Sequence, residues 1–210
     1  MSERERELEA RLRMKLDRHA YRWARAVTRS VLSRYTAVEP RALEFVPGPS
    51  GKPEIATAIE TPLQFSLAHT DEMTTLLVGD GRVVGVDVES ERRLATGRLP
   101  LSVLGSRELA RLNRSPAEQR PVRLLEHWTL KEAYAKACGR GLELPLDRIE
   151  FVITGRRINA RFDARFGPDP RPWWFALPEA CPGYVIALAA GLHGEGEGPL
   201  ELQTFSAGAA

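Results

Sequence analysis

The sequence predicts an α+β protein made of two similar lobes within one chain. Two observations support this prediction. In the first half, an amphipathic helix pattern is followed by strand-like runs, and the same order recurs in the second half. The composition is that of an ordinary globular protein: 210 residues, 43% hydrophobic and 28% charged. We place the boundary near Gly105, with residues 1–104 as the N-terminal lobe and 105–190 as the C-terminal lobe.

The first predicted element is a single helix over residues 3–35. Apolar residues recur every three or four positions and form one stripe along it. A second stripe is basic and comprises Arg11, Lys15, Arg18, Arg22, Arg25 and Arg29. Residues 11–34 hold eight basic residues and one acid, a local charge of +7 in a chain of net charge +2. Such a face is either solvated or binds a polyanion, which would be nucleic acid or the phosphates of a small ligand.

In the rest of the N-terminal lobe, the sequence predicts a turn-rich connector and three strands. The connector is 47–53, and the strands are 63–69, 74–78 and 82–89. An Asp-Gly pair at 80–81 predicts a hairpin between the last two strands. Residues 90–114 read as polar and irregular.

The C-terminal lobe is predicted to begin with a helix. It starts at 115–118, bends at Pro121 and ends at Cys138, before two glycines suited to a left-handed cap. Strands of a second sheet follow at 149–153, 157–162, 173–177 and 184–190, and the Gly-rich tail 191–210 is expected to be disordered.

Several classes of protein are excluded. The two cysteines are too few for a disulfide framework and lack zinc-ligand spacing. The longest apolar run, 184–192, is too short to span a bilayer, and the charged N-terminus does not resemble a signal peptide. We therefore expect a cytoplasmic protein with no membrane partner.

Residues 85–89 read Gly-Val-Asp-Val-Glu and form the first candidate site. Side chains alternate along a strand, so Asp87 and Glu89 share one face. Two neighbouring carboxylates repel unless they are solvated, counter-charged or metal-bound, and such oxygen ligands suit Mg²⁺ together with phosphate oxygens. The plainer interpretation is an exposed strand end.

The second candidate is the helical run 128–136, which reads Trp-Thr-Leu-Lys-Glu-Ala-Tyr-Ala-Lys. Trp128, Glu132 and Lys136 stack on one helix face. A surface Glu–Lys pair would contribute only ~0.3–0.5 kcal/mol. However, only four of the 30 basic residues are lysines, and two of them, Lys131 and Lys136, fall here. Lysine is a compact point charge suited to a single phosphate oxygen.

Two weaker motifs are Gly-Lys-Pro at 51–53 and Ser-Leu-Ala-His at 66–69. Together with the acids and lysines they suggest phosphoryl transfer. No phosphate-binding Gly-rich loop, kinase motif or dinucleotide fingerprint is present in the sequence.

These motifs resemble those of the 4′-phosphopantetheinyl transferases, in particular the larger single-chain, pseudo-dimeric (surfactin-type) branch. Residues 85–89 are similar to that family's Gly-Ile/Val-Asp-Ile/Val-Glu. Residues 128–142, about forty positions later, resemble its Trp-x-x-Lys-Glu-Ala-x-x-Lys-x-x-Gly-x-Gly-Leu. The two weaker motifs follow in the right order, and the likeness covers roughly residues 18–190. One departure is Ala68, where the family often has Ser; it removes one hydroxyl contact but leaves His69.

The resemblance implies a holo-[acyl-carrier-protein] synthase type of activity, in a monomer whose active site lies between two pseudo-twofold-related lobes. The phosphopantetheine arm of coenzyme A, the co-substrate, would move to a serine of an apo acyl or peptidyl carrier protein, releasing 3′,5′-ADP. The product would serve fatty-acid, polyketide or nonribosomal peptide synthesis.

The resemblance also implies roles for individual residues. Asp87, Glu89 and Glu132 would hold Mg²⁺, with Mn²⁺ as the other candidate. Glu132 would be the base for the serine, directly or through water. Lys136 would stabilise or protonate the leaving phosphate. The remaining contacts to coenzyme A, on its pyrophosphate or its nucleotide end, would come from Lys131, Lys52, Ser66, His69 and Arg22.

Two other functions fit parts of the sequence. A Mg²⁺-dependent phosphodiesterase or nuclease could use the same carboxylates to activate water. A non-enzymatic polyanion-binding module could use the N-terminal arginines, but it leaves the three acids unexplained. The transferase interpretation calls for a carrier protein and no nucleic acid. Carrier proteins are acidic near the modified serine, so Arg11 to Arg29 or the Arg-rich stretch 92–114 would speed their encounter.

Overall fold

The computed structural model describes residues 1–48, 51–56, 59–70, 73–96, 99–141, 144–163, 171–179 and 181–193. The helices are α1 (Glu3–Arg11), α2 (Lys15–Thr36), α3 (Ser106–Arg114) and α4 (Arg120–Cys138), with short 3-10 helices η1 (Glu91–Thr96), η2 (Leu101–Val103), η3 (Ala117–Gln119) and η5 (Leu146–Arg148). The strands are β1 (Phe45–Pro47), β2 (Pro53–Ile55), β3 (Leu63–Thr70), β4 (Met73–Asp80), β5 (Val84–Ser90), β6 (Ile149–Thr154), β7 (Arg157–Phe162), β8 (Trp173–Ala176) and β9 (Tyr184–Gly191). The predicted α+β class is confirmed. The expected disordered tail falls mostly on residues 194–210, which lie outside the described residues.

The prediction of one N-terminal helix is wrong, because the chain breaks between α1 and α2 and α1 folds back along α2. Arg29 donates to both carboxylate oxygens of Glu5, at 3.0 and 2.8 Å, and Arg22 donates to Glu9 at 2.5 Å. In a continuous helix, Glu5 and Arg29 would be about 36 Å apart. The acids of α1 thus neutralise part of the basic stripe, which the regular apolar spacing does not reveal.

The central sheet joins strands from both halves of the chain. Its order is β5-β9-β8, all antiparallel, while β3–β4, β1–β2 and β6–β7 form separate antiparallel pairs. Two predictions are therefore wrong: β4 pairs with β3 rather than with β5, and the C-terminal strands do not form a sheet of their own. Strands β5 and β9 are buried on both faces. Each therefore pairs with a strand inside the molecule, and not with a sequence neighbour in a surface hairpin.

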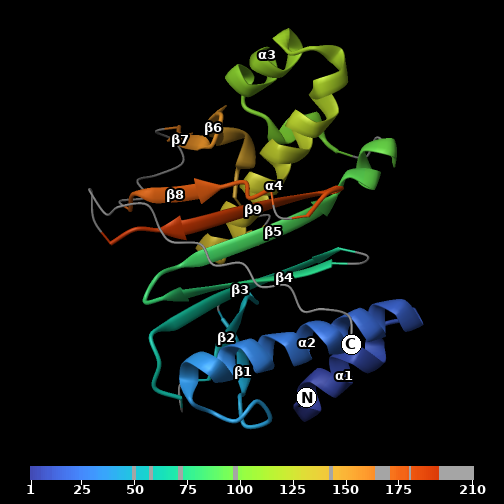
Figure 1. The fold of residues 1–210 in the computed structure, drawn as a ribbon, viewed down its shortest axis with the longest axis vertical. Helices are drawn as coiled ribbons and strands as arrows, with labels where there is room; N and C mark the ends of the chain where they lie inside the picture. The colour runs from blue at the N-terminus through green and yellow to red at the C-terminus, as the bar shows by residue number, and fades with distance from the viewer. Residues whose placement is uncertain are drawn as a thin grey trace.

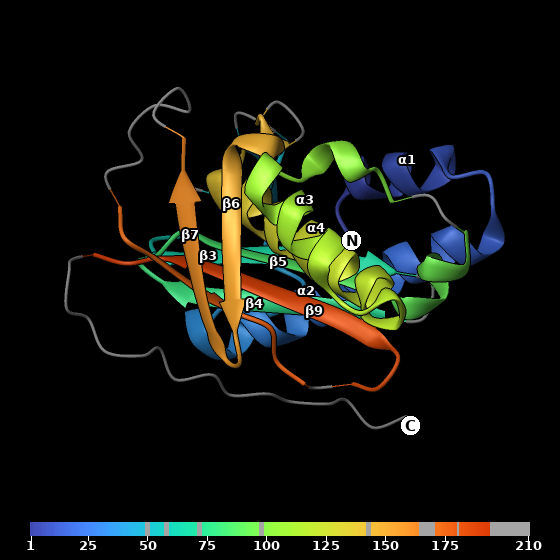
Figure 2. The same ribbon diagram turned by 90° about the horizontal axis from the view of Figure 1, so that it is seen from above.

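Helix α4 covers one side of this sheet, and β3–β4 followed by α2 lie on the other side (Figure 1). Seen from above, α3, α4 and the β6–β7 hairpin lie over the strands (Figure 2). Tyr134 and Leu130 of α4 belong to a core cluster that includes Phe151, Phe175 and Ala187. The opposite face of β5 and β9 packs, through valines, Ile186 and Leu188, against β3.

A close approach of backbone fixes α4 over β5. A Cβ atom at Gly85 would lie 1.9 Å from the carbonyl oxygen of Ala133 and 2.5 Å from the amide nitrogen of Ala137. Only glycine allows this contact. Because Gly85 and Asp87 lie on the same face of β5, this contact also brings Asp87 under α4.

The stretch 90–114 is not irregular as predicted, since it contains η1, η2 and α3. Its polar residues mislead because Glu108 of α3 is buried, with only 1% of its surface exposed. None of the helices in the described segments is both long and apolar enough to cross a membrane.

Candidate active site

Strand β5 presents its acids to helix α4. Val86 and Val88 point into the core on the β3 side, so Asp87 and Glu89 face the helix. From α4, Lys136 donates to Asp87 Oδ1 at 2.6 Å, and the indole Nε1 of Trp128 donates to Glu89 Oε1 at 2.8 Å. The structure therefore brings together the two motifs that the sequence separates by about forty residues.

The carboxylates of this cluster are buried or half-buried, and two of them are only partly satisfied. Asp87 is 7% exposed, and its Oδ2 has no hydrogen-bond partner. Glu132 Oε1 is likewise buried and without a partner. Buried polar atoms without partners are uncommon in proteins, and a bound ion is one of the groups that can satisfy them. These two orphaned oxygens are acceptors of the kind that a hard cation prefers.

Burial raises the pKa of Asp87 to about 6 against the opposing charge of Lys136, and Glu89 and Glu132 raise it further. Burial also raises the pKa of Glu132, and Lys136 again opposes the shift. In both cases burial is the main cause, because it disfavours the charged form of a carboxyl group.

Among the described residues, no group of three His, Cys, Asp or Glu side chains is gathered closely enough to hold a metal ion. Two cations of the protein already contact these carboxylates, which explains in part why the acids are not gathered around one point. Lys136 forms an ion pair with Asp87, and Arg93 of η1 donates to Glu89. The residue types and the orphaned oxygens still fit Mg²⁺, provided that these cations yield to it.

Sequence reasoning missed Arg93. Its guanidinium lies over the Trp128 ring, 5.1 Å from the ring centre, while it contacts Glu89. Arg93 follows Glu89 by four residues, a spacing that indicates an ion pair when both residues lie on a helix. The sequence predicts an irregular stretch here, so this spacing does not identify the contact.

Lys131 is not at this site, contrary to the expectation that it would contact the pyrophosphate. Its side chain is fully buried, and its ammonium donates to Glu108 at 2.7 Å and to the carbonyls of Val103, Leu146 and Ile149. Burial lowers the pKa of Lys131, and Glu108 opposes that shift. The four contacts saturate the ammonium donors, so the structure gives Lys131 a structural role.

The four residues expected at the nucleotide end of coenzyme A are spread over the N-terminal half. Lys52 donates to the carbonyl of Val84 at 2.8 Å, and burial lowers its pKa. The hydroxyl of Ser66 is buried and accepts the Val86 amide at 3.1 Å, which ties β3 to β5. His69 is exposed near the end of β3. The Arg22 side chain is 64% exposed and pairs with Glu9.

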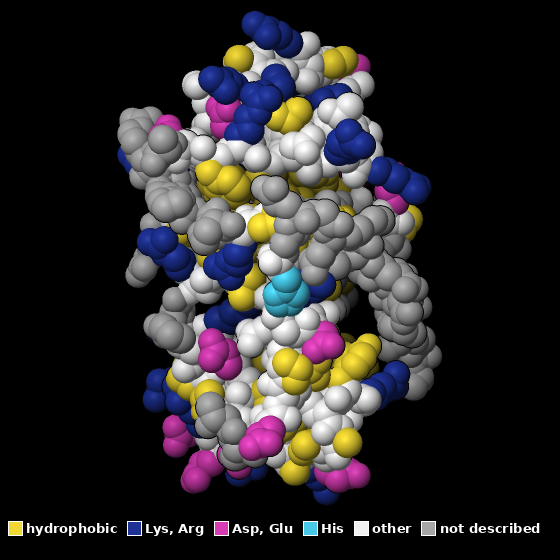
Figure 3. Space-filling view, turned by 90° about the vertical axis from the view of Figure 1, so that its left-hand side faces the viewer, with side chains coloured by type: hydrophobic (Ala, Val, Ile, Leu, Met, Phe, Trp, Pro, Cys, Tyr) yellow, Lys and Arg dark blue, Asp and Glu magenta, His cyan; other side chains and the backbone are white. Residues whose placement is uncertain are grey.

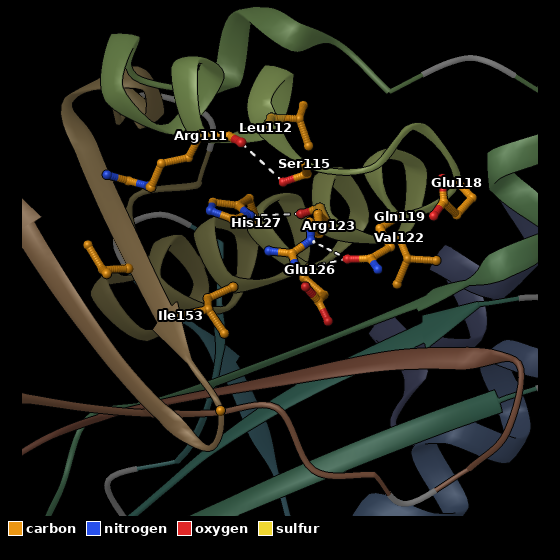
Figure 4. Close-up of a pocket in the computed structure, with 12 residues that line it drawn as sticks. Arg111, Leu112, Ser115, Glu118, Gln119, Val122, Arg123, Glu126, His127 and Ile153 are labelled. Atoms are coloured by element: carbon orange, nitrogen blue, oxygen red, sulfur yellow. Dashed lines mark hydrogen bonds between the residues drawn. The ribbon is translucent and has the colours of Figure 1, made fainter.

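A hollow of about 470 Å³ lies elsewhere, between α3, α4 and β6 (Figure 4). Arg111, Arg123 and His127 line it together with apolar side chains such as Ile153. It contains none of the predicted site residues. From α4, Trp128 and Lys136 contact β5, and the side chains that line the hollow lie on the other side of the helix.

Comparison with protein families matches residues 83–189, about half of the chain, to the 4′-phosphopantetheinyl transferase superfamily. The 4′-phosphopantetheinyl transferase HetI of Nostoc sp. is 33% identical over 146 residues, which cover 65% of this chain and 58% of that protein. A phosphopantetheinyl transferase of Thraustochytrium sp. is 27% identical, covering 92% of this chain and 71% of its own. The 4′-phosphopantetheinyl transferase Sfp of Bacillus subtilis is 23% identical, covering 84% and 75%.

Among solved structures, a holo-(acyl-carrier-protein) synthase from Bacillus anthracis in complex with CoA (3′,5′-ADP) aligns with a TM-score of 0.45 and 16% identity. The alignment covers 52% of this chain and 96% of that one.

Proposed function

Because the chain belongs to the 4′-phosphopantetheinyl transferase superfamily, we propose that it transfers the 4′-phosphopantetheine arm of coenzyme A to a serine of an apo carrier protein. The single observation that carries this proposal is the meeting of Asp87 and Glu89 with the Glu132–Lys136 turn of α4. The family match, residues 83–189, begins just before β5, ends within β9 and includes all four residues.

In this proposal Asp87, Glu89 and Glu132 would hold Mg²⁺, and Mn²⁺ is the second candidate. A bound divalent ion would neutralise charge on the pyrophosphate of coenzyme A. The orphaned oxygens of Asp87 and Glu132 support this assignment.

The chemistry is a displacement at phosphorus. The carrier serine oxygen forms a bond to the phosphorus that bears the pantetheine arm, and the bond to the bridging oxygen breaks, so that 3′,5′-ADP leaves with the electron pair. Glu132 would take the serine proton, directly or through water. Lys136 would stabilise or protonate the leaving phosphate.

For the nucleotide end of coenzyme A we retain Lys52, His69 and Arg22 as proposed contacts. His69 and Arg22 have exposed side chains. Lys52 would need to release the Val84 carbonyl. Ser66 and Lys131 are better explained as structural residues, because both are buried and bonded to backbone groups.

The two-lobed organisation remains part of the proposal. Helix α2 lies against β3 and β4, and α4 lies against β5 and β9, so each half pairs one long helix with strands. We propose lobes at 1–104 and 105–190 with the active site at their junction, in a monomer that acts in the cytoplasm.

The proposed partner is an acidic carrier protein. Lys and Arg side chains gather at the upper end of the face shown in Figure 3, whereas most acidic side chains on that face lie lower. The stretch 92–114 supplies the arginines of η1 and α3. We favour it for the encounter over the α2 stripe, since Arg22 and Arg29 already pair with α1.

The test is intact mass spectrometry of apo acyl and peptidyl carrier proteins after incubation with coenzyme A and Mg²⁺. The wild type should add the phosphopantetheine mass to at least one carrier, and Asp87→Ala and Glu132→Ala should each lose transfer at least a hundredfold while remaining folded. Glu118→Ala, an exposed acid of η3, is the matched control and should transfer normally. Transfer at wild-type rates by Asp87→Ala would contradict the assigned site.

A further inference from the structure

Arg93 contacts two residues of the proposed active site, Glu89 and Trp128. Its guanidinium donates to Glu89 Oε1, the same oxygen that accepts the Trp128 indole N–H, and it also lies over the Trp128 ring. The Arg93 side chain is 34% exposed, and that of Glu89 is 13% exposed. Stacking on the indole limits the positions open to the guanidinium.

The charges of the cluster do not balance. Three carboxylates, those of Asp87, Glu89 and Glu132, are opposed by two cations, Lys136 and Arg93. Lys136 engages Asp87, and Arg93 engages Glu89. Within the described part of this cluster, the buried oxygens without a partner are Asp87 Oδ2 and Glu132 Oε1. The Arg93 guanidinium therefore contacts Glu89, the carboxylate for which no such oxygen is found.

We propose that Arg93 is a positioning residue that occupies Glu89 in place of the metal ion, competes with the ion for that carboxylate, and thereby sets the cation affinity of the site. The inference rests on the proposed function, because it takes Asp87, Glu89 and Glu132 as the ligands. A carboxylate oxygen that already accepts from a guanidinium and an indole must change partners before it can bind a divalent ion, and a nearby unit charge repels that ion.

The test compares Arg93→Gln with Arg92→Gln in the substrate-free protein. Both variants lose one positive charge from η1, and they differ in that Arg92 is exposed whereas Arg93 contacts Glu89. Each protein is titrated with MgCl₂ alone at constant ionic strength, and the affinity is taken from the rise in melting temperature. Arg93→Gln should bind Mg²⁺ about tenfold more tightly than the wild type, the size of effect expected for one charge near a divalent ion. Arg92→Gln should stay within about twofold.

A second measurement uses the wild type, so it does not depend on the folding of any variant at position 93. Mg²⁺ should displace the guanidinium from the Trp128 ring and change the indole emission over the same concentration range that raises the melting temperature. Subtracting the signal of Trp128→Phe isolates this residue from the other three tryptophans.

Equal affinities of the two glutamine variants, weaker binding by Arg93→Gln, or a constant Trp128 emission during the titration would each overturn the inference. In those cases the wild type would still bind Mg²⁺ and modify a carrier. If the wild type does neither, the proposed function itself fails.

Discussion

The environment of Asp87 disfavours its charged form. Burial holds its pKa at about 6, so the folded protein keeps a proton that the unfolded chain releases near pH 4. The metal-free protein should therefore lose stability as the pH rises between these values. A ligating carboxylate must be ionised, so Mg²⁺ should stabilise the protein above pH 6 and lose this effect below it.

Melting temperatures recorded with and without MgCl₂, on both sides of pH 6, test this prediction. Asp87→Asn is the control and should show no Mg²⁺-dependent rise at any pH. An undiminished rise in the wild type well below pH 6 would contradict the role of Asp87.

Lys131 gives a prediction about stability. Its ammonium and the Glu108 carboxylate are both fully buried, 2.7 Å apart. Lys131→Met leaves a buried carboxylate without its counter-ion and should lower the free energy of unfolding by about 3–5 kcal/mol. The double variant Lys131→Met/Glu108→Gln should recover part of this loss.

Urea denaturation provides the measurement, with Lys15→Met, an exposed lysine of α2, as the matched control. A loss no larger than that of the control would show that the pair contributes little.

At the residue scale, the sequence predicts which acids and lysine meet between β5 and α4, but not what surrounds them. Asp87, Glu89, Glu132 and Lys136 follow from local periodicity, which fixes their faces on one strand and one helix. The scarcity of lysine also singles out Lys131, but the same compact charge suits a cage of backbone carbonyls as well as a phosphate. Its partner Glu108 depends on a contact across 23 residues and leaves no local signal.

Among the elements, the packing of α4 on β5 determines where Glu132 and Lys136 lie. Gly85→Ala would place a methyl group against the backbone of α4 and should cost several kcal/mol of stability or displace the helix. Gly139→Ala is the matched control. Its added Cβ meets nothing within 4 Å, and its positive φ of 66° should cost only about 1 kcal/mol. Chemical denaturation compares the two, and similar losses would contradict the close contact.

The pairing of α1 with α2 gives a second prediction at this scale. Glu5 accepts from both Arg29 nitrogens and from the Ser2 amide. Glu5→Ala should lower the free energy of unfolding by about 1–3 kcal/mol, because it leaves Arg29 buried without its partner. Glu7→Ala removes an exposed acid from the same helix and should change stability by less than about 0.5 kcal/mol. Equal effects in urea denaturation would show that the ion pair is dispensable.

The elements missed by sequence share one physical cause. The break before α2, the pairing of β5 with β9 and the helical state of α3 all depend on partners distant in the chain. Helix α4 and strands β3, β6 and β7 carry strong local periodicity and lie within a few residues of their predicted bounds, apart from the start of α4, which follows η3.

For the whole molecule, one sheet accounts for the position of the site. Because β5 from the first half pairs with β9 from the second, and α4 lies across both, the acids and Lys136 meet where the two halves of the chain join. The family match covers this unit, residues 83–189, whereas α1, α2 and β1–β4 precede it.

We propose that this junction transfers phosphopantetheine and does not hydrolyse coenzyme A. The most direct test measures 3′,5′-ADP released from coenzyme A in the presence of Mg²⁺, with and without an apo carrier protein. Transfer predicts release only with the carrier, in equal moles to the carrier serine modified, and none with a carrier whose serine is replaced by alanine. Release at the same rate without any carrier would contradict the claim and identify a phosphodiesterase.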